Sequence, residues 1–337
     1  MTNPSWAPLW KGRLPIWGQP CMPHSCWSAT SSDCTRQWRA LDRSLPQTLP
    51  KKSGTAERYV REWLDANAAS GYLVYDAVTS RYQLPPEQAF ALTQLDLLRV
   101  FALFHRASRT NRKLHRHYER GKASVGTERF FRPNYQNNLL SSWVPALEGV
   151  QAKLTAGAVV ADVGCGHGAS TMLMARAFPK SRFFGFDYHS GSIEYARHVA
   201  GRDRLLDQIT FEVASAKSYP RNGGYHLVTF FDCLHDMGDP SGAAQHVLST
   251  LKPDGTWMIV EPFAEDKPEL NHNPVGRIYY SASTMICTPA SMAQEVGAAL
   301  GAQAGEERIR QVVTFAGFTR FRRAAQTPFN LVFEARP

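Results

Sequence analysis

The sequence predicts an α/β fold built on a doubly wound, mostly parallel β-sheet, with a smaller domain in front of it. Two observations carry this prediction. From about residue 125 onward, short apolar segments typical of strands alternate with segments typical of helices, as in sheets that helices cover on both faces. In addition, the first of these strands runs into a turn with glycine at every second position, which is typical of the ligand-binding edge of such a sheet.

Four segments follow one another along the 337 residues. Residues 1–52 hold five of the eight tryptophans and show neither helical nor strand periodicity, so we interpret them as an atypical, poorly ordered segment. Residues 53–94 are expected to form the smaller domain, and residues 95–124 a basic connector. Residues 125–337 are expected to form the α/β domain.

The smaller domain is predicted to contain one helix followed by a β-hairpin. The helix starts near Thr55, a suitable N-cap, and stops near Gly71. Three apolar residues share its buried face: Val60, Trp63 and Leu64. Two short strands follow, at 72–75 and 82–84. This order is typical of the end of a winged helix, which can bind DNA or can serve packing and dimerisation.

The net charge of +9 lies entirely in the first half of the chain. Residues 1–150 hold 20 Lys and Arg against 11 Asp and Glu, whereas residues 151–337 hold 18 of each kind. Residues 99–132 alone carry ten basic and two acidic side chains. Such a stretch can contact nucleic acid, but a solvated surface or connector is the simpler interpretation. We therefore do not expect nucleic acid as a partner.

Seven strands are predicted in the α/β domain, which makes its sheet Rossmann-like. Five of them alternate with helices, at 159–163, 182–187, 209–213, 226–231 and 256–261. Helices are expected at 171–178 and 192–200, and Lys252-Pro253-Asp254-Gly255 predicts a tight turn before the fifth strand. The last two strands, within 318–328 and 329–337, are expected to close the sheet as an antiparallel hairpin.

The glycine-rich sequence VVADVGCGHGAS (159–170) raises the question of which nucleotide it binds. It fits a relaxed dinucleotide fingerprint, with Asp187 nineteen residues after Gly168, where an acid that holds a ribose is expected. However, Asp162 would repel a pyrophosphate, which carries about two negative charges. S-adenosylmethionine has an ammonium group, a sulfonium group and a ribose but no phosphate, so Asp162 favours this ligand. The glycines then serve close approach of the backbone.

Four segments of the chain resemble the class I S-adenosylmethionine-dependent methyltransferases. They are VVADVGCGHGAS, FFGFDYH, VTFFDCLHDMGDP and LKPDGTWMIVEP, in this order and spacing. More closely, the chain is similar to the bacterial enzymes that carry a winged-helix domain ahead of the catalytic domain. The resemblance covers roughly residues 53–94 and 125–337. It implies S-adenosyl-L-methionine as cofactor, a small molecule as methyl acceptor and pairing of subunits into a homodimer.

The resemblance also implies a set of cofactor-binding residues. Four of them surround the methionine part of the cofactor, namely Asp162, Gly164, Cys165 and Gly166. The others follow later strands, at the ribose (Asp187), the adenosine (Tyr188), the adenine (Ser215 and Ala216) and the closing end of the site (Asp232). His167 and His189 are expected beside the cofactor and not as bases.

His235 is the candidate catalytic base. Methyl transfer from a sulfonium depends mainly on positioning, but a hydroxyl acceptor must also lose its proton to a base. LHDMGDP resembles the His-Asp-Trp motif of small-molecule O-methyltransferases, whose His is the base, with Met237 here in place of Trp. The resemblance thus implies an oxygen as acceptor atom. The alternative is that His235 and Asp236 only cap the following helix or the cofactor pocket.

Further candidates are weaker. Glu261, at the end of the fifth strand, could orient the base or the acceptor. The segment 273–289 lies where the family inserts a substrate-covering element, and four of its residues are candidates for the pocket wall, although packing is the simpler interpretation: Arg277, Tyr279, Tyr280 and Met285. No metal site is predicted, because the spacing of Cys21, His24, Cys26 and Cys34 fits no familiar zinc pattern.

Two segments depart from the family: residues 1–52 and about 95–122, before family-like sequence resumes at GTERFFRP (126–133). A shifted reading frame in both segments is one hypothesis, which translation of the other frames of the coding DNA would test. Three alternatives stay open for the whole chain. They are a DNA-binding regulator with a ligand-sensing nucleotide fold, an NAD-dependent oxidoreductase, and a degenerate copy that binds cofactor without turnover.

The location is predicted from apolar segments and cysteines. No stretch approaches the roughly 18 consecutive apolar residues of a membrane helix, and the first residues lack the order of a secretory signal. The six cysteines are too sparse for a disulfide scaffold of this size. We therefore expect a cytoplasmic enzyme with reduced thiols and no membrane partner.

Overall fold

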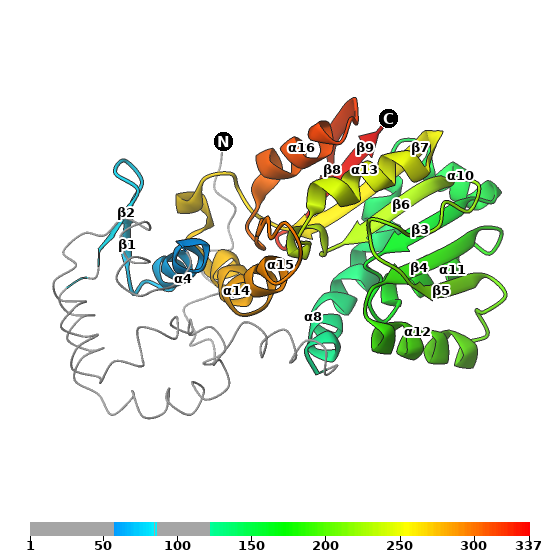
Figure 1. The fold of residues 1–337 in the computed structure, drawn as a ribbon, viewed down its shortest axis with the longest axis horizontal. Coiled ribbons are helices and arrows are strands. Elements are labelled where there is room, and N and C mark those ends of the chain that lie inside the picture. The colour runs from blue at the N-terminus through cyan, green and yellow to red at the C-terminus, as the bar shows by residue number, and fades with distance from the viewer. Residues whose placement is uncertain (1–56, 84, 86–121) are drawn as a thin grey trace.

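The computed structural model describes residues 57–83, 85 and 122–337 (Figure 1). The expectations for residues 1–52, for the cysteines within them and for most of the basic connector concern residues outside these ranges. Among the helices of the described part, none is long and apolar enough to cross a membrane.

A seven-stranded sheet forms the centre of the α/β domain, in the order β5-β4-β3-β6-β7-β9-β8. Its strands are β3 (Val159–Val163), β4 (Arg182–Asp187), β5 (Ile209–Val213), β6 (Tyr225–Phe231), β7 (Leu251–Pro262), β8 (Arg320–Gln326) and β9 (Asn330–Arg336). The first five are parallel to one another, and β9 is antiparallel to both β7 and β8. The predicted fold class, including the closing hairpin, is confirmed.

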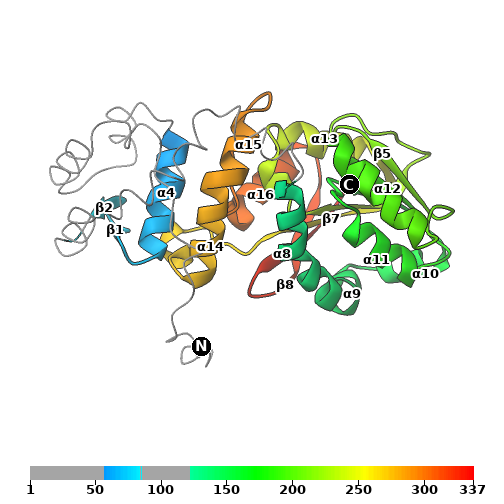
Figure 2. The same ribbon diagram turned by 90° about the horizontal axis from the view of Figure 1, so that it is seen from below.

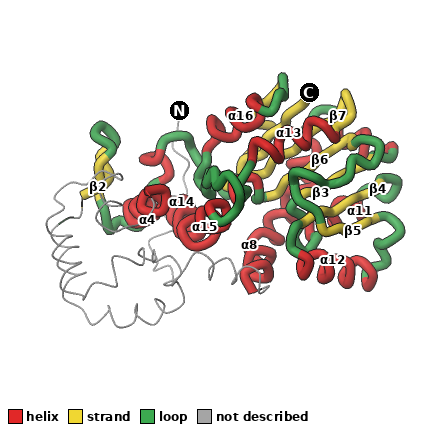
Figure 3. Tube along the Cα trace, in the orientation of Figure 1, coloured by secondary structure: helices red, strands yellow, loops and turns green. Residues whose placement is uncertain are grey.

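Helices cover both faces of this sheet (Figures 2 and 3). On one face, α10 (Val150–Ala156), α11 (Ala169–Ala177) and α12 (Ser190–Arg202) pack their apolar side chains into one core cluster. On the other face, α13 (Pro240–Thr250) and α16 (Gly305–Phe315) contribute to a second cluster. β3 and β6 are neighbours, but the chain continues from β3 through α11 on one face and from β6 through α13 on the other, so a crevice opens at their carboxyl ends.

The prediction of a tight turn ahead of the fifth strand was wrong. The strand β7 begins at Leu251, so the four residues 252–255 lie within it. Leu251 pairs with Tyr225 and Thr256 pairs with Leu227, so these four residues lie opposite a single residue of β6 and form a bulge. Pro253 has no N–H to donate to a strand neighbour, whereas Leu251 is buried and anchors the strand start.

The N-terminal unit contains the predicted helix and hairpin. Helix α4 (Glu57–Ala69) is followed by β1 (Val74–Asp76) and β2 (Arg81–Gln83), which pair antiparallel. The predicted apolar face of α4 is buried and packs against the hairpin. Helix α4 lies beside α14 (Pro274–Ala282) in both ribbon views (Figures 1 and 2).

Two further segments complete the described chain. Before the sheet, α8 (Lys122–Asn138) continues through a π-helical turn, Leu139–Trp143, into α9 (Val144–Ala146). The remaining elements follow the ends of β6 and β7, and they are η2 (Leu234–Asp236), η3 (Pro268–Asn271), α14, the π-helix η4 (Ser283–Cys287) and α15 (Thr288–Met292). These elements surround the carboxyl edge of the sheet.

Candidate active site

A cavity of about 240 Å³ lies at the carboxyl ends of β3, β4 and β6. Its wall is formed by the loops after β3, β4, β5 and β6, by α8 and by residues 290–295. Eight predicted cofactor-binding residues line it: Gly164, Cys165, Gly166, Asp187, Tyr188, Ser215, Ala216 and Asp232. His167 and His189 line it as well. The structure thus brings together residues that four separate strands supply.

The glycine turn requires glycine for two reasons. Gly164 and Gly168 both have positive φ, +72° and +76°, which side chains other than glycine rarely adopt. A Cβ atom on Gly164 would lie 2.7 Å from Sγ of Cys233, and one on Gly168 would lie 2.5 Å from Cζ of Phe211. The turn therefore passes close to Cys233, just after β6, and to Phe211 of β5, and its backbone lines the cavity.

Asp162 lies beneath the glycine turn, and it is absent from the cavity wall. Its side chain is buried, and one of its oxygens accepts hydrogen bonds from Ser170 Oγ at 2.7 Å and Thr171 Oγ1 at 2.5 Å. The other accepts one from Thr229 Oγ1 at 3.0 Å. Burial raises the pKa of Asp162 to about 6, although these hydroxyl groups lower it. The structure thus places Asp162 beneath the turn, and its direct contact with the cofactor stays a prediction.

Asp187 ends β4 and faces the cavity. Its Oδ2 accepts a hydrogen bond from the Gly166 amide at 2.9 Å, and its Oδ1 accepts one from the His189 amide at 2.8 Å. Burial raises the pKa of Asp187, and these two amides oppose the increase. Each carboxylate oxygen has a second lone pair, so Asp187 can still accept hydrogen bonds from two neighbouring hydroxyls of a ribose.

The charges around the cavity are predominantly negative. Six acidic residues line it: Glu128, Asp187, Asp232, Asp236, Asp239 and Glu295. Among the described lining residues, Lys217 is the one lysine or arginine, and it forms ion pairs with Asp239 and Glu295. Such a wall favours an ammonium or sulfonium group and disfavours a pyrophosphate. In the sequence analysis, Asp162 alone was the reason to prefer S-adenosylmethionine over a dinucleotide. In the structure, the acidic residues of the whole cavity wall support the same preference.

Helix α8 supplies residues to the site that the sequence analysis did not identify. Glu128, Phe131 and Tyr135 line the cavity, and Oε2 of Glu128 lies 2.7 Å from Nδ1 of His167. The hydroxyl of Tyr135 donates a hydrogen bond of 2.8 Å to Asp232. The family-like sequence GTERFFRP contains Glu128 and Phe131, so it could have indicated that this segment belongs to the site. That these residues reach the cavity depends on the tertiary packing of α8.

Asp232 is held in an unusual backbone conformation at the end of β6. Its φ is +51°, and its carboxylate accepts hydrogen bonds from Tyr135 and from Nδ2 of Asn330, each 2.8 Å long. Burial, with a further contribution from the charge of Glu261, raises the pKa of Asp232 to about 8. A strained and fully hydrogen-bonded acid at a strand end is typical of functional sites.

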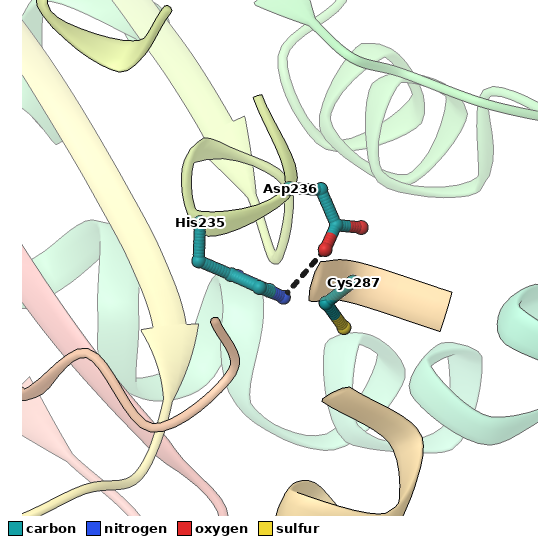
Figure 4. Close-up of side chains that lie close together, drawn as sticks. All are labelled: His235, Asp236 and Cys287. Carbon is teal, nitrogen blue, oxygen red and sulfur yellow. Dashed lines mark ion pairs between the residues drawn. The ribbon is translucent and has the colours of Figure 1, made fainter. Parts of the chain in front are cut away.

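His235 lies behind the cavity wall, between two carboxylates. It is 2% exposed, its Nδ1 lies 2.5 Å from Oε2 of Glu261, and its Nε2 lies 3.1 Å from Oδ1 of Asp236 (Figure 4). Burial lowers the pKa of His235, but the charges of Asp236 and Glu261 outweigh it and raise the pKa well above its ordinary value. Asp236 lines the cavity and thus lies between it and the imidazole.

The candidates for the pocket wall do not line this cavity. Tyr279 is buried, and its hydroxyl donates a hydrogen bond of 2.6 Å to the carbonyl of Phe329. Tyr280 is buried, and its ring lies 6.3 Å from that of His272, which precedes α14 and contacts Asp65 of α4. Neither Arg277 nor Met285 belongs to the cavity wall. The segment that does cover the cavity comes later, at Ala290, Gln294 and Glu295.

Two family models match the chain. Residues 154–317 match a methyltransferase domain, and residues 36–94 match an Rv2258c-like winged HTH domain, whose match begins before residue 53. With the fold and the cavity described above, these matches define a class I S-adenosylmethionine-dependent methyltransferase. The chain thus carries a methyltransferase domain with an Rv2258c-like winged HTH domain ahead of it.

Curated relatives match about a third of this chain. The ubiquinone biosynthesis O-methyltransferase of Candida albicans is 28% identical over 108 residues, which cover 32% of this chain and 33% of the relative. The trans-aconitate 2-methyltransferase of Streptomyces coelicolor is 28% identical over 109 residues, 32% of this chain and 36% of the relative. The chain thus spans about a third of the length of the curated relatives that it matches.

Solved structures match the whole fold at low sequence identity. An O-methyltransferase family 2 protein from Planctomyces limnophilus, in complex with apigenin, has a TM-score of 0.60 and 14% identity, covering 93% of this chain and 92% of its own. Human N-acetylserotonin methyltransferase, in complex with S-adenosylmethionine, has a TM-score of 0.50 and 14% identity, covering 93% of both chains. At this identity the likeness shows a shared fold.

Proposed function

We propose that this protein transfers a methyl group from S-adenosyl-L-methionine to an oxygen atom of a small-molecule acceptor. One observation carries the proposal. The acid-lined cavity at the carboxyl edge of the sheet is bounded on one side by the glycine turn and Asp187, and on the other by Asp236, behind which lie His235 and Glu261. A cofactor site and a candidate base are therefore adjacent.

The donor groups of the cavity fit the cofactor. The acidic wall suits the ammonium and sulfonium charges, and Asp187 offers two oxygens at the place where a ribose is expected. We assign Tyr188 to the adenosine, Ser215 and Ala216 to the adenine, and Gly164 and Gly166 to the methionine part. When bound, the cofactor supplies an electrophilic methyl group on its sulfonium. Asp162 supports the turn from below through Ser170 and Thr171.

His235 takes the acceptor's proton in this proposal. Glu261 holds Nδ1 of the ring, so the opposite nitrogen, Nε2, is the one directed toward Asp236 and the cavity side. In its neutral form the ring accepts the hydroxyl proton, and the two carboxylates then stabilise the imidazolium that forms. A strong base of this kind suits a hydroxyl acceptor, because an alcohol or phenol gives up its proton reluctantly.

Calorimetry tests the cofactor assignment first. The purified full-length chain should bind S-adenosylhomocysteine and should not bind NADH. Because Asp187 is assigned to the ribose hydroxyls, the Asp187→Ala variant should bind S-adenosylhomocysteine at least tenfold more weakly, a loss of about 1.4 kcal/mol. Binding of NADH in preference to S-adenosylhomocysteine would overturn the proposal and favour the oxidoreductase.

Kinetics with a methyl acceptor tests the base. His235→Ala should lower kcat by about 100-fold or more, the usual contribution of a general base, and should leave the affinity for S-adenosylhomocysteine unchanged. His198→Ala is the matched control, because His198 is an exposed residue of α12 in the same domain. Equal kcat in both variants would leave His235 as a structural residue.

Homodimerisation belongs to the same proposal. The hairpin of the N-terminal unit exposes Val74 and Val78, which a second subunit could cover. Light scattering on the full-length chain should give twice the 37.7 kDa mass of one chain. A mass of one chain at micromolar concentration would contradict the dimer and leave the catalytic proposal intact. The cytoplasmic location expected from the sequence stays a prediction.

A further inference from the structure

Three donor atoms of different kinds converge beside the cavity. They are an imidazole nitrogen of His235, a carboxylate oxygen of Asp236 and the thiol sulfur of Cys287, all within 4.8 Å of one another. Figure 4 shows the three side chains approaching one another from two separate segments. His235 and Asp236 belong to η2, whereas Cys287 is the last residue of the π-helix η4. Single π-helical turns are frequent at functional sites.

We propose that His235, Asp236 and Cys287 form a binding site for a divalent transition-metal ion of the Zn²⁺ type, and that the bound ion switches methyl transfer off. The proposed inhibition rests on the proposed function of His235 as the base. The proposed metal binding is independent of that function.

The donor set is suited to zinc. Zn²⁺ is bound by imidazole nitrogen, thiolate sulfur and carboxylate oxygen at bond lengths that place tetrahedral ligands about 3.3 to 3.8 Å apart. Nε2 of His235 and Oδ1 of Asp236 are 3.1 Å apart, close to that spacing. Cys287 Sγ, within 4.8 Å of both, needs only a small approach to complete three ligands.

Glu261 holds His235 in the way that a metal site requires. Metal-binding histidines usually donate the other ring N–H to a carboxylate, which fixes the tautomer and the ring orientation. Oε2 of Glu261 lies 2.5 Å from Nδ1 of His235, and Oε1 of Glu261 accepts a hydrogen bond from the amide of Leu234 at 3.0 Å. With Nδ1 held in this way, Nε2 is the nitrogen left for a cation.

The site is also accessible to an ion. Oδ1 of Asp236 is buried and accepts no hydrogen bond, although it forms an ion pair with the His235 ring. The same residue lines the cavity, which provides a path of entry and room for a water molecule as fourth ligand. Three protein ligands with one open position are typical of exchangeable zinc sites in enzymes.

Metal and proton compete for the same atoms. Binding requires a neutral His235 and a Cys287 thiolate, so it releases protons. Because these protons must leave before the ion binds, metal affinity should increase with pH. A bound ion occupies Nε2, the nitrogen that would take the acceptor's proton, and the enzyme then loses its base.

The direct test is metal titration of the full-length chain after removal of metals, in a background where Cys21, Cys26 and Cys34 are replaced by Ser. One Zn²⁺ should bind per chain by calorimetry, and one Co²⁺ should give the intense absorption of a cobalt–thiolate bond. Cys287→Ser should abolish that absorption and weaken Zn²⁺ binding at least tenfold. The matched control is Cys233→Ser, because Cys233 lies near the same cavity and outside the cluster.

The kinetic test uses Cys287→Ser, which removes a ligand and leaves His235 and Glu261 in place. Measured against its own rate without metal, half-inhibition of this variant should require at least tenfold more Zn²⁺ than half-inhibition of the unmodified protein. Absence of a cobalt–thiolate band, or equal Zn²⁺ binding in both proteins, would overturn the site. Zn²⁺ binding without inhibition would overturn the switch alone. If no acceptor is methylated at all, the titration still decides whether the site exists.

Discussion

Asp162 illustrates how a buried residue can support a site from beneath the turn that lines it. Three hydroxyl groups donate to its carboxylate, two from the start of α11 and one from β6. These hydrogen bonds join the first strand to the helix that follows the glycine turn and to the neighbouring strand. The carboxylate thereby fixes the shape of the glycine turn. This turn forms one end of the cavity.

Asp162→Ala should reduce both stability and cofactor binding. The change leaves buried hydroxyl groups of Ser170, Thr171 and Thr229 without their acceptor, at a cost of about 1 to 3 kcal/mol in the free energy of unfolding. Urea unfolding measures this cost, and calorimetry measures S-adenosylhomocysteine affinity. Asp207→Ala, at an exposed position, serves as control. Weaker binding with unchanged stability would instead indicate direct contact between Asp162 and the cofactor.

The pH dependence of methyl transfer should depend on the carboxylates around His235. The groups that face the ring are Asp236 and Glu261, with Cys287 and Asp232 nearby. Asp236 and Glu261 raise the pKa of His235, so kcat/KM for a hydroxyl acceptor should increase with pH as the ring loses its proton, in a range above the ordinary pKa of histidine. Glu261→Gln removes one stabilising charge, so the pKa of His235 falls and the increase moves to lower pH. An identical pH profile in the variant would contradict this assignment.

At the scale of elements, the glycine turn requires glycine both because of its backbone conformation and because β5 and α12 pack closely against it. Gly168 directly precedes α11, and a Cβ there would meet Phe211 of β5 at 2.5 Å and Ala196 of α12 at 3.3 Å. The close approach of these three elements is what lets the helix begin directly at the cavity. Glycine is thus required for packing as well as for its positive φ.

Gly168→Ala should therefore destabilise the protein more than a matched glycine change elsewhere. The positive φ costs about 1 kcal/mol, and the overlap with Phe211 adds about 1 to 3 kcal/mol. Gly223→Ala is the control, because Gly223 has φ of +78° and no atom lies within 4 Å of its added Cβ. Chemical denaturation of both variants gives the difference. Equal losses would show that Phe211 moves aside freely.

The strand boundaries show where sequence patterns succeed and fail. The parallel strands β3, β4 and β5 have the predicted bounds, because each is a short apolar run that ends in a polar or glycine-containing loop. The start of β7 differs because Pro253 and Gly255 were interpreted as a turn between elements. In the structure the neighbouring strand β6 holds Leu251 in register before this bulge. Strand pairing across the sheet, which a local pattern does not report, decided the outcome.

At the scale of the whole molecule, α4 connects the N-terminal unit to the catalytic domain. The guanidinium of Arg58 donates to the carbonyls of Ala299 and Leu300, at 2.9 and 2.8 Å, and forms an ion pair with the buried Glu62. Residues 299 and 300 follow the segment that covers the cavity. A single arginine of the N-terminal unit therefore supports the wall of the active site.

Arg58→Ala should destabilise this junction strongly, and Arg61→Ala should not. Glu62 is 2% exposed, so loss of Arg58 leaves a buried carboxylate without its partner, at a cost of about 3 kcal/mol. Arg61 and Glu57 form a pair with the same spacing on the same helix, but both are about one-third exposed, and their loss should cost less than about 1 kcal/mol. Thermal and urea unfolding compare the two variants. Equal effects would mean that Glu62 takes up a proton or another partner without penalty.

The sequence by itself determined the class of this protein, because strand periodicity, the glycine turn and the motifs after the fourth and fifth strands are local patterns. Eight of the nine residues that it assigned to the cofactor line the cavity. The tertiary structure decided the roles that depend on distance: the place of Asp162 beneath the turn, Tyr135 against Asp232, and Cys287 beside His235. These residues are far apart along the chain, and their approach follows from the packing of helices against the sheet. No local pattern of residue types encodes that packing.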